Sequence, residues 1–127
     1  MAIRKELTVR LQNSPGALKR LCQILAEERI NIIALNVEAG GTLRMVVDNP
    51  LRAIGALETC DYSVEQRNVL FLEMPHRYGS FEHAAQILAN ADVNIEYTYA
   101  SSTENSLAVN VVFGVENAER AATVTGV

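Results

Sequence analysis

Long apolar runs and clustered cysteines are absent from this chain of 127 residues, and we expect no signal peptide. No apolar segment approaches the roughly 20 residues that a membrane-spanning helix needs, and the first six residues lead directly into an alternating segment rather than a leader. Cys22 and Cys60 have no second Cys or His at metal-ligand spacing, so we interpret both as small apolar residues. We expect a cytoplasmic protein without a membrane segment, a metal or a cofactor.

Positive charge is scarce, above all in the second half. Residues 67–127 hold three Lys or Arg against seven Asp or Glu, and the whole chain has a net charge of −4. This balance argues against a nucleic-acid partner. The basic residues near the start have acidic or apolar neighbours, which favours a solvated face; they are Arg4, Lys5, Arg10, Lys19 and Arg20.

Catalytic signatures are also sparse. No glycine loop for phosphates separates a strand from a helix, because Gly40-Gly41 lies in a predicted hairpin. His76 has no acid or nucleophile beside it in the sequence. We therefore predict that the protein is not an enzyme and has no catalytic residues.

An internal repeat is the most informative feature that is present. At an offset of 63 residues, Gly16 falls on Gly79, residues 23–26 on residues 86–89, and residues 31–32 on residues 94–95. The matches span a whole helix and enter the next strand, which indicates a duplicated supersecondary unit. A unit this short buries only about 60% of its unfolded surface. We expect two domains, 1–66 and 67–127, that pack on each other and carry two versions of any site.

Periodicity predicts the same order of elements in each unit. In the first, residues 6–11 alternate as a strand, Asn13-Ser14-Pro15-Gly16 forms a turn whose Asn and Ser can cap a helix, and residues 17–28 carry a helical stripe. Strands 32–38 and 43–47 follow, then a helix from Asn49-Pro50 whose stripe is Leu51, Ile54 and Leu57, and a strand over 62–65. This βαββαβ order predicts an α+β, ferredoxin-like unit with an antiparallel sheet and both helices on one face.

The second unit follows the pattern but is too short. Strands over 69–74, 94–99 and 107–113 and a helix over 80–89 are expected, with a second helix starting near 116–117. The counterpart of Tyr62 would lie at position 130, so the last strand is missing or rudimentary. Bare strand edges invite pairing. We expect this edge to be completed by the Tyr62 region, by another subunit, or by residues outside the given sequence.

These motifs resemble those of the ACT domains, small-molecule sensing modules attached to many enzymes of amino-acid metabolism. The family pattern is an apolar strand, a turn ending in Pro-Gly, a small residue and Leu, an amphipathic helix, and an Asn-Ile step into the second strand. The first unit carries all of it, whereas the second places His76 and Tyr78 where the first has Asn13 and Pro15. The chain thus resembles a tandem pair of ACT domains.

The resemblance implies that a free amino acid binds at an interface between two such domains. In the serine-sensing domain of phosphoglycerate dehydrogenase, Asn residues at the positions matching Asn13 and Asn31 hold the effector. The candidate ligand-binding residues of the two units are Asn13, Ser14, Pro15, Gly16, Ala17, Leu18, Asn31 and Ile32, then His76, Arg77, Tyr78, Gly79, Ser80, Asn94 and Ile95.

Physical chemistry supports these positions independently. Unpaired backbone N–H groups at a helix start suit a carboxylate, and an Asn side chain can accept from an ammonium or donate to a carboxylate. The first motif contains no charged residue, which favours a small neutral or aliphatic amino acid. In the second, Arg77 would pair with the ligand carboxylate or with an acidic side chain, and His76 would make affinity sensitive between about pH 5 and 8.

Purely structural interpretations compete at each position. The 13–16 segment is also a good turn and N-cap, Asn31 and Asn94 are suited to ending helices in the left-handed conformation, and 76–78 is also interpretable as an exposed loop.

The sequence is therefore compatible with two functions. The first is a regulatory sensor, expected to be a homodimer, that binds a free amino acid and modulates a partner, such as an enzyme of amino-acid metabolism, or its own assembly. The alternative is an interaction subunit resembling the small subunit of acetolactate synthase, with no essential ligand of its own.

Overall fold

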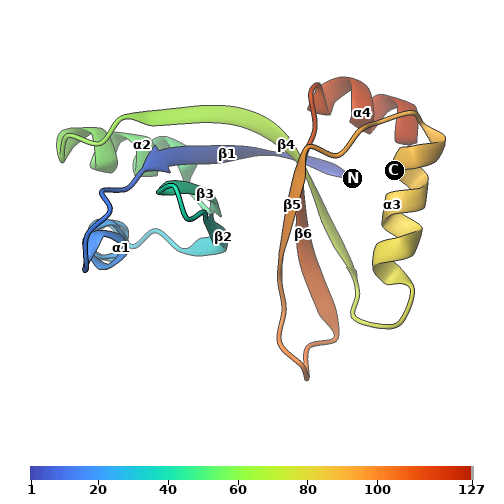
Figure 1. Cartoon of the computed structure of the whole chain (residues 1–127), viewed down its shortest axis with the longest axis horizontal. Helices are drawn as coiled ribbons and strands as arrows, with labels where there is room; N and C mark the ends of the chain where they lie inside the picture. The colour runs from blue at the N-terminus through green and yellow to red at the C-terminus, as the bar shows by residue number, and fades with distance from the viewer. Residues whose placement is uncertain (127) are drawn as a thin grey trace. The chain divides into compact units, whose positions relative to one another are not determined.

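The computed structural model describes residues 1–126 and divides into two compact units (Figure 1). The first unit is Lys5–Arg67, and the second combines Met1–Arg4 with residues 68–126. Two long strands give residues to both: β1 (Ala2–Arg10) and β4 (Val64–Pro75).

The first unit contains residues 5–10 of β1, then α1 (Ala17–Glu27), β2 (Ile32–Val37), β3 (Thr42–Val47), α2 (Pro50–Thr59) and the start of β4. Its strand order is β2-β3-β1-β4. The antiparallel registers align Leu7 of β1 and Leu35 of β2 with Met45 of β3. This is the predicted βαββαβ arrangement.

The second unit contains residues 68–75 of β4, then α3 (Ser80–Asn90), β5 (Tyr97–Ser101), β6 (Ala108–Gly114) and α4 (Ala118–Thr125). Its strand order is β1-β4-β6-β5, and Leu72 of β4 aligns antiparallel with Val111 of β6. The α+β, ferredoxin-like fold class predicted from the sequence is confirmed, including the absence of a strand after α4 within residues 1–126.

The edge left by that absent strand is covered by the beginning of the chain. Met1–Arg4 groups with the second unit, and β1 is the strand beside β4. Met1 packs against the second core, and the Arg4 guanidinium lies 4.9 Å from the ring centroid of Phe71. None of the three completions expected from the sequence is found, because β1 begins four residues earlier than its alternation indicated and fills the position itself.

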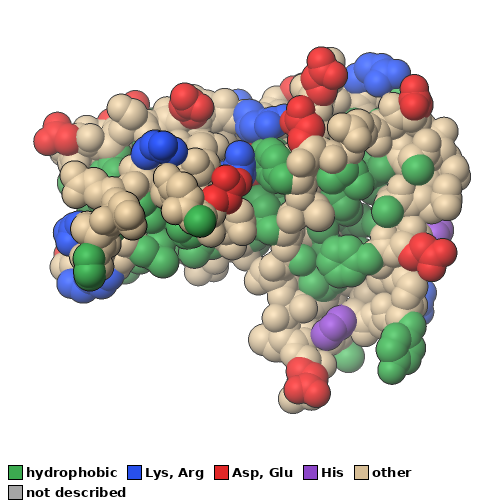
Figure 2. All heavy atoms as spheres, viewed as in Figure 1, with side chains coloured by type: hydrophobic (Ala, Val, Ile, Leu, Met, Phe, Trp, Pro, Cys, Tyr) green, Lys and Arg blue, Asp and Glu red, His purple; other side chains and the backbone are tan. Residues whose placement is uncertain are grey.

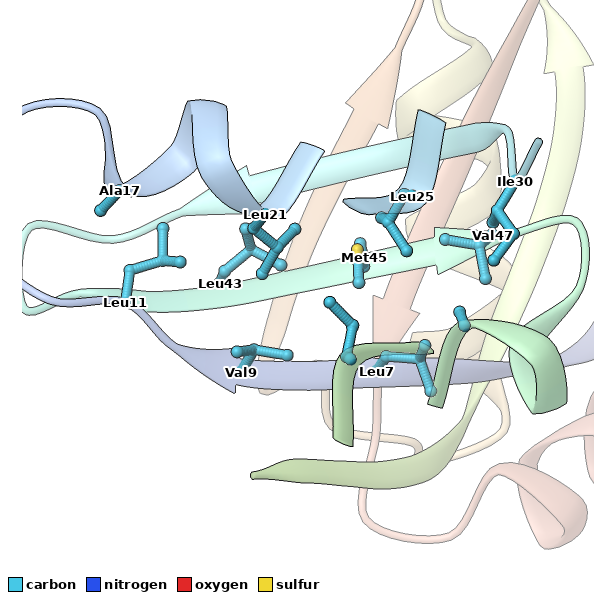
Figure 3. Packing of buried hydrophobic residues seen from close by; sticks show 12 residues of the cluster. Leu7, Val9, Leu11, Ala17, Leu21, Leu25, Ile30, Leu43, Met45 and Val47 are labelled. Atoms are coloured by element: carbon cyan, nitrogen blue, oxygen red, sulfur yellow. The ribbon is translucent and has the colours of Figure 1, made fainter. Parts of the chain in front are cut away.

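The first core lies between one face of its sheet and both helices (Figure 3). Leu21 and Leu25 of α1 point toward Leu43 and Met45 of β3, and Leu57 of α2 joins them. Because alternate strand residues face opposite sides of a sheet, only Leu7 and Val9 of β1 reach this cluster.

The second core uses smaller side chains. Its helices bury Ala84 and Leu88 from α3 and Ala118 and Ala121 from α4, against β4 and β6. Among strand residues the largest is Phe113. At the repeat offset, Ala84 takes the place of Leu21, so α3 brings one large buried side chain where α1 brings two.

Several local expectations were wrong. Leu51 is 79% exposed, because the apolar face of α2 runs through Ala53 and Leu57 instead. The two strands predicted over 62–65 and 69–74 are one strand of 12 residues, since neither Gly nor Pro lies between them. Cys60 is exposed rather than a core residue.

Candidate functional site

The turn between the first strand and the first helix has the same geometry in both units. Gly16 and Gly79 precede α1 and α3 with φ of 83°, a left-handed conformation that favours glycine. Neither helix has a side-chain cap, so the capping predicted for Asn13 and Ser14 was wrong. The amides of Gly16, Leu18 and Lys19 have no hydrogen-bond partner within the described residues, which leaves three donors at the start of α1.

A cavity of about 450 Å³ adjoins this turn in the first unit. That volume lies within the range of about 300–1,000 Å³ typical of small-molecule sites. It lies among the end of β1, the start of α1 and the segment between α2 and β4. The lining residues are Arg10, Leu11, Gln12, Ala17, Arg20, Cys60, Asp61, Tyr62 and Ser63.

Three charged side chains line this first-unit cavity. The Arg10 Nη1 donates to Thr42 Oγ1 at 3.3 Å, and the Arg20 Nη2 donates to Ser14 Oγ at 3.4 Å. Asp61 has φ of 68° just after α2, and its amide donates to the carbonyl of Glu58 at 3.1 Å. Within residues 1–126 none of these three charges forms an ion pair. Figure 2 shows Lys and Arg side chains gathered over α1.

A cavity of about 310 Å³ occupies the matching place in the second unit. It lies beside the end of β4 and the start of α3, with Met1 on the side where β1 lies. Its lining is more apolar and includes an acidic, a basic and an imidazole side chain, those of Glu73, Arg77 and His83. The remaining lining residues are Met1, Leu72, Met74, Pro75, Tyr78, Gly79, Ser80, Ala84 and Ile87.

The two cavities correspond through the repeat. At the offset of 63, Arg10 matches Glu73 and Arg20 matches His83, while Ala17 matches Ser80. The site residues predicted from the sequence came only from the turn and from the step into the second strand, so the charged residues at the strand end and in the helix were missed. The repeat gives no indication of Asp61 or Met1 as cavity residues, because only the order of strands in the sheet brings them beside the cavities.

The predicted site residues are only partly brought together. Ala17 lines the first-unit cavity, and Arg77, Tyr78, Gly79 and Ser80 line the second-unit cavity. Asn94 lies in a different cavity, with Asp92 and Asn117 among its neighbours. The residues that line none of these three cavities are Asn13, Ser14, Pro15, Gly16, Leu18, Asn31, Ile32, His76 and Ile95.

Asn31 and His76 each form a polar contact with a neighbouring segment of the chain. The Asn31 amide donates to Asp48 Oδ1 at 3.1 Å, and its carbonyl accepts from the Asp48 amide at 3.1 Å. His76 Nδ1 lies 3.1 Å from the carbonyl oxygen of Ser106. The left-handed residues after α1 and α3 are Arg29 and Asp92, so Asn31 and Asn94 do not end these helices in that conformation.

The described residues form neither a metal-ligand cluster nor a membrane-spanning helix. Within residues 1–126, no three His, Cys, Asp or Glu side chains gather as metal ligands would. In the same part of the chain, no helix has the length and apolar character for crossing a membrane.

A βαββαβ unit and a βαββα unit whose sheet is completed by β1, with matching cavities at the strand-to-helix turns, define a tandem ferredoxin-like protein. The model of the ACT domain pair matches residues 1–126, so the chain belongs to the ACT domain pair family. The resemblance noted in the sequence is therefore confirmed.

Solved structures agree with this assignment. The protein BT0572 from Bacteroides thetaiotaomicron is 29% identical over 98% of this chain and 87% of its own, with a TM-score of 0.87. The regulatory subunits of aspartate kinase from Thermus flavus and Thermus thermophilus are 18% and 20% identical, each over 98% of this chain, and cover 94% and 92% of their own lengths. Both have a TM-score of 0.65, a likeness of fold. No curated protein matches the chain.

Proposed function

We propose that this protein is a non-catalytic sensor that binds a free amino acid at its ACT domains and changes its own assembly or the activity of a partner enzyme of amino-acid metabolism. The observation that carries the proposal is the pair of corresponding cavities, one at each strand-to-helix turn. Each combines charged side chains with an apolar wall, as recognition of a zwitterion requires. A coupling of about 1–3 kcal/mol between ligand and assembly would suffice for regulation.

The side chains of Asn13 and Asn31 suit a role at an ACT–ACT interface. Both residues are exposed, and neither side-chain amide has a hydrogen-bond partner within residues 1–126. Each can donate to a carboxylate and accept from an ammonium. Within the unit the two residues lie at opposite ends of the sheet, Asn13 just beyond the end of β1 where Arg10 pairs with Thr42, and Asn31 beside Asp48 after β3. A ligand at the turn would therefore meet Asn13 of one ACT domain and the residue equivalent to Asn31 of a second domain placed over it.

The second-unit cavity fits a small neutral or aliphatic amino acid. Arg77 supplies a cation for the α-carboxylate and Glu73 an anion for the ammonium, which balances a zwitterion. Leu72, Met74 and Ile87 offer apolar surface for the side chain. The ligand would gain free energy by burying its own apolar surface there.

An apolar edge supports assembly as a homodimer. In the first unit β2 is the edge strand, paired only with β3. Its Leu35 and Val37 are 37% and 42% exposed. An edge strand with apolar side chains invites pairing with a second chain, so we propose that two copies meet along β2.

The test is thermal unfolding of the purified protein with each of the twenty amino acids. A ligand at 100 times its Kd stabilises the folded protein by about 2.7 kcal/mol, which is a rise in Tm of several degrees for a chain of this size. We expect one or a few amino acids to give this rise. Asn13→Ala and Asn31→Ala should reduce it, whereas Asn105→Ala, in the loop between β5 and β6, should not.

The absence of a Tm shift with any amino acid at millimolar concentration would contradict the sensor proposal. The exposed β2 edge would then favour the alternative, an interaction subunit that docks on an enzyme and needs no ligand. Light scattering of the free protein and of a Val37→Lys variant tests the proposed dimer, because a charge on this apolar edge strand should give a monomer.

A further inference from the structure

We infer that the first-unit cavity binds an acidic amino acid, an α-amino dicarboxylate, and thus takes a different ligand class from the second-unit cavity. This inference rests on the proposed sensing function and names the ligand of one of its two sites. It differs from the expectation drawn from the turn motif, which contains no charged residue. The charges come from outside the motif, at the end of β1, in the second turn of α1 and after α2.

The charges of the cavity complement those of the ligand. Arg10 and Arg20 supply two cations and Asp61 supplies one anion. An α-amino dicarboxylate carries two carboxylates and one ammonium. None of the three protein charges has an ion-pair partner within the described residues, so all three are available to a ligand. A neutral amino acid would leave one guanidinium without a counter-charge.

The position of Arg20 connects it to the turn. Its Nη2 donates to Ser14 Oγ, and its Nη1 would lie 3.2 Å from a Cβ built on Gly16. The guanidinium therefore lies over the glycine, beside the unpaired amides of Gly16 and Leu18. A guanidinium presents its N–H groups in a planar fork that suits a carboxylate.

Asp61 is held by its loop rather than by a charged neighbour. It adopts the left-handed conformation, which Asp and Asn tolerate better than most residues. The Tyr62 amide that follows donates to the carbonyl of Leu57 at 3.1 Å. Asp61→Asn is consequently a conservative test, because it removes the charge while the backbone conformation stays accessible.

The second-unit cavity lacks this pattern. Glu73 stands where the first unit has Arg10, and His83 stands where it has Arg20. A dicarboxylate would meet one Arg and an opposing carboxylate there. The inference therefore assigns acidic ligands to the first unit alone.

The experiment is calorimetric titration of the full chain with aspartate and glutamate, with their amides asparagine and glutamine, and with succinate and glutarate, which lack the amine. We expect an acidic amino acid to bind at least about tenfold more tightly than its amide or its amine-free analogue, as loss of a charge-assisted hydrogen bond implies. Arg10→Gln and Arg20→Gln should abolish the preference for the acid over the amide. Asp61→Asn should abolish the preference for the amine.

Lys19→Gln is the matched control, since it removes the same charge from the same helix at a residue that does not line the cavity. It should leave the Kd of the acidic amino acid unchanged, and so should His83→Gln in the second-unit cavity. Equal binding of acid and amide, or loss of acid binding in His83→Gln alone, would overturn this inference while the sensing function stands. Binding of no amino acid at all would overturn both.

Discussion

The two units reach the same fold through different chain connections. The first unit supplies its own fourth strand, the start of β4, whereas the second takes Met1–Arg4 from the beginning of β1. The strand-to-helix turns are nonetheless alike, with Gly16 and Gly79 both at φ of 83°. The comparison teaches that the fold requires a strand at that edge of the sheet and places no condition on where in the chain it originates.

The units differ most in what fills their cores and cavities. Two large helical residues, Leu21 and Leu25, enter the first core from α1, and only Leu88 enters the second from α3. The first-unit cavity carries two Arg and one Asp, while the second carries Glu73, Arg77 and His83 with more apolar surface. Duplication has kept the backbone and changed the chemistry.

The largest effect is expected from removing equivalent core leucines. Leu25 and Leu88 are 1% and 0% exposed, so Leu25→Ala and Leu88→Ala should each lower the free energy of unfolding by about 2–5 kcal/mol. Urea denaturation measures both. Leu51→Ala, at a residue 79% exposed, should change it by less than about 0.5 kcal/mol. A small cost at only one of the two leucines would break the equivalence of the cores.

The next largest loss of stability is expected from disrupting the strand that completes the sheet of the second unit. Replacing Met1–Arg4 with Gly and Ser residues removes the packing of Met1 on the second core and the contact of Arg4 with Phe71. The expected cost is about 2 kcal/mol, from apolar burial and a cation–π contact. Hydrogen exchange should show lost protection in residues 68–75 and unchanged protection in α1. Equal loss in both regions would contradict the division into these units.

A smaller effect is expected at the two glycines. Gly16→Ala and Gly79→Ala place a side chain in the left-handed conformation, which costs about 1–2 kcal/mol. A Cβ at Gly79 would have open space, whereas one at Gly16 would lie 3.2 Å from the Arg20 guanidinium. Thermal unfolding should therefore show similar losses, and only Gly16→Ala should weaken binding of an acidic amino acid. Weakening by both variants would contradict the separate cavities.

The smallest effect concerns the second helix of each unit. Asn49 and Asn117 accept hydrogen bonds from the amides of Arg52 and Arg120, at 3.2 and 2.9 Å. Asn49→Ala and Asn117→Ala should each cost about 1 kcal/mol. Denaturation midpoints give the comparison, with Asn49→Asp and Asn117→Asp as variants that retain the cap. An Asp variant as unstable as its Ala variant would show that the cap is not the cause.

Much of the fold was predictable because it depends on local patterns. Alternation, helical stripes and the Asn-capped helix starts predicted the order of elements in both units. The predictions failed where the structure of a segment depends on contacts with residues that are distant in the sequence. The alternation of β1 gave no sign that the strand begins at Ala2, since Met1–Arg4 belong to the second unit rather than to the first. Leu51 was assigned to the core by spacing alone, although Ala53 provides the buried face.

The candidate site was predictable only where it is contiguous in sequence. The turn motif located the cavity of each unit, and Ala17 and Ser80 line them. Arg10 and Asp61 could not be paired from sequence, because the order of strands brings the end of β1 beside the segment after α2. The roles of Asn13, Asn31 and Asn94 as ligand-binding residues stay predictions.

The most direct test of two chemically different amino-acid sites is an amide chemical-shift titration of isotope-labelled protein with aspartate and, separately, with leucine. Aspartate should move the resonances of Ala17, Asp61 and Ser63 around the first-unit cavity, and leucine those of Ser80, His83 and Ala84 around the second. If neither ligand moves any of these resonances, or if both move the same set, the account is contradicted.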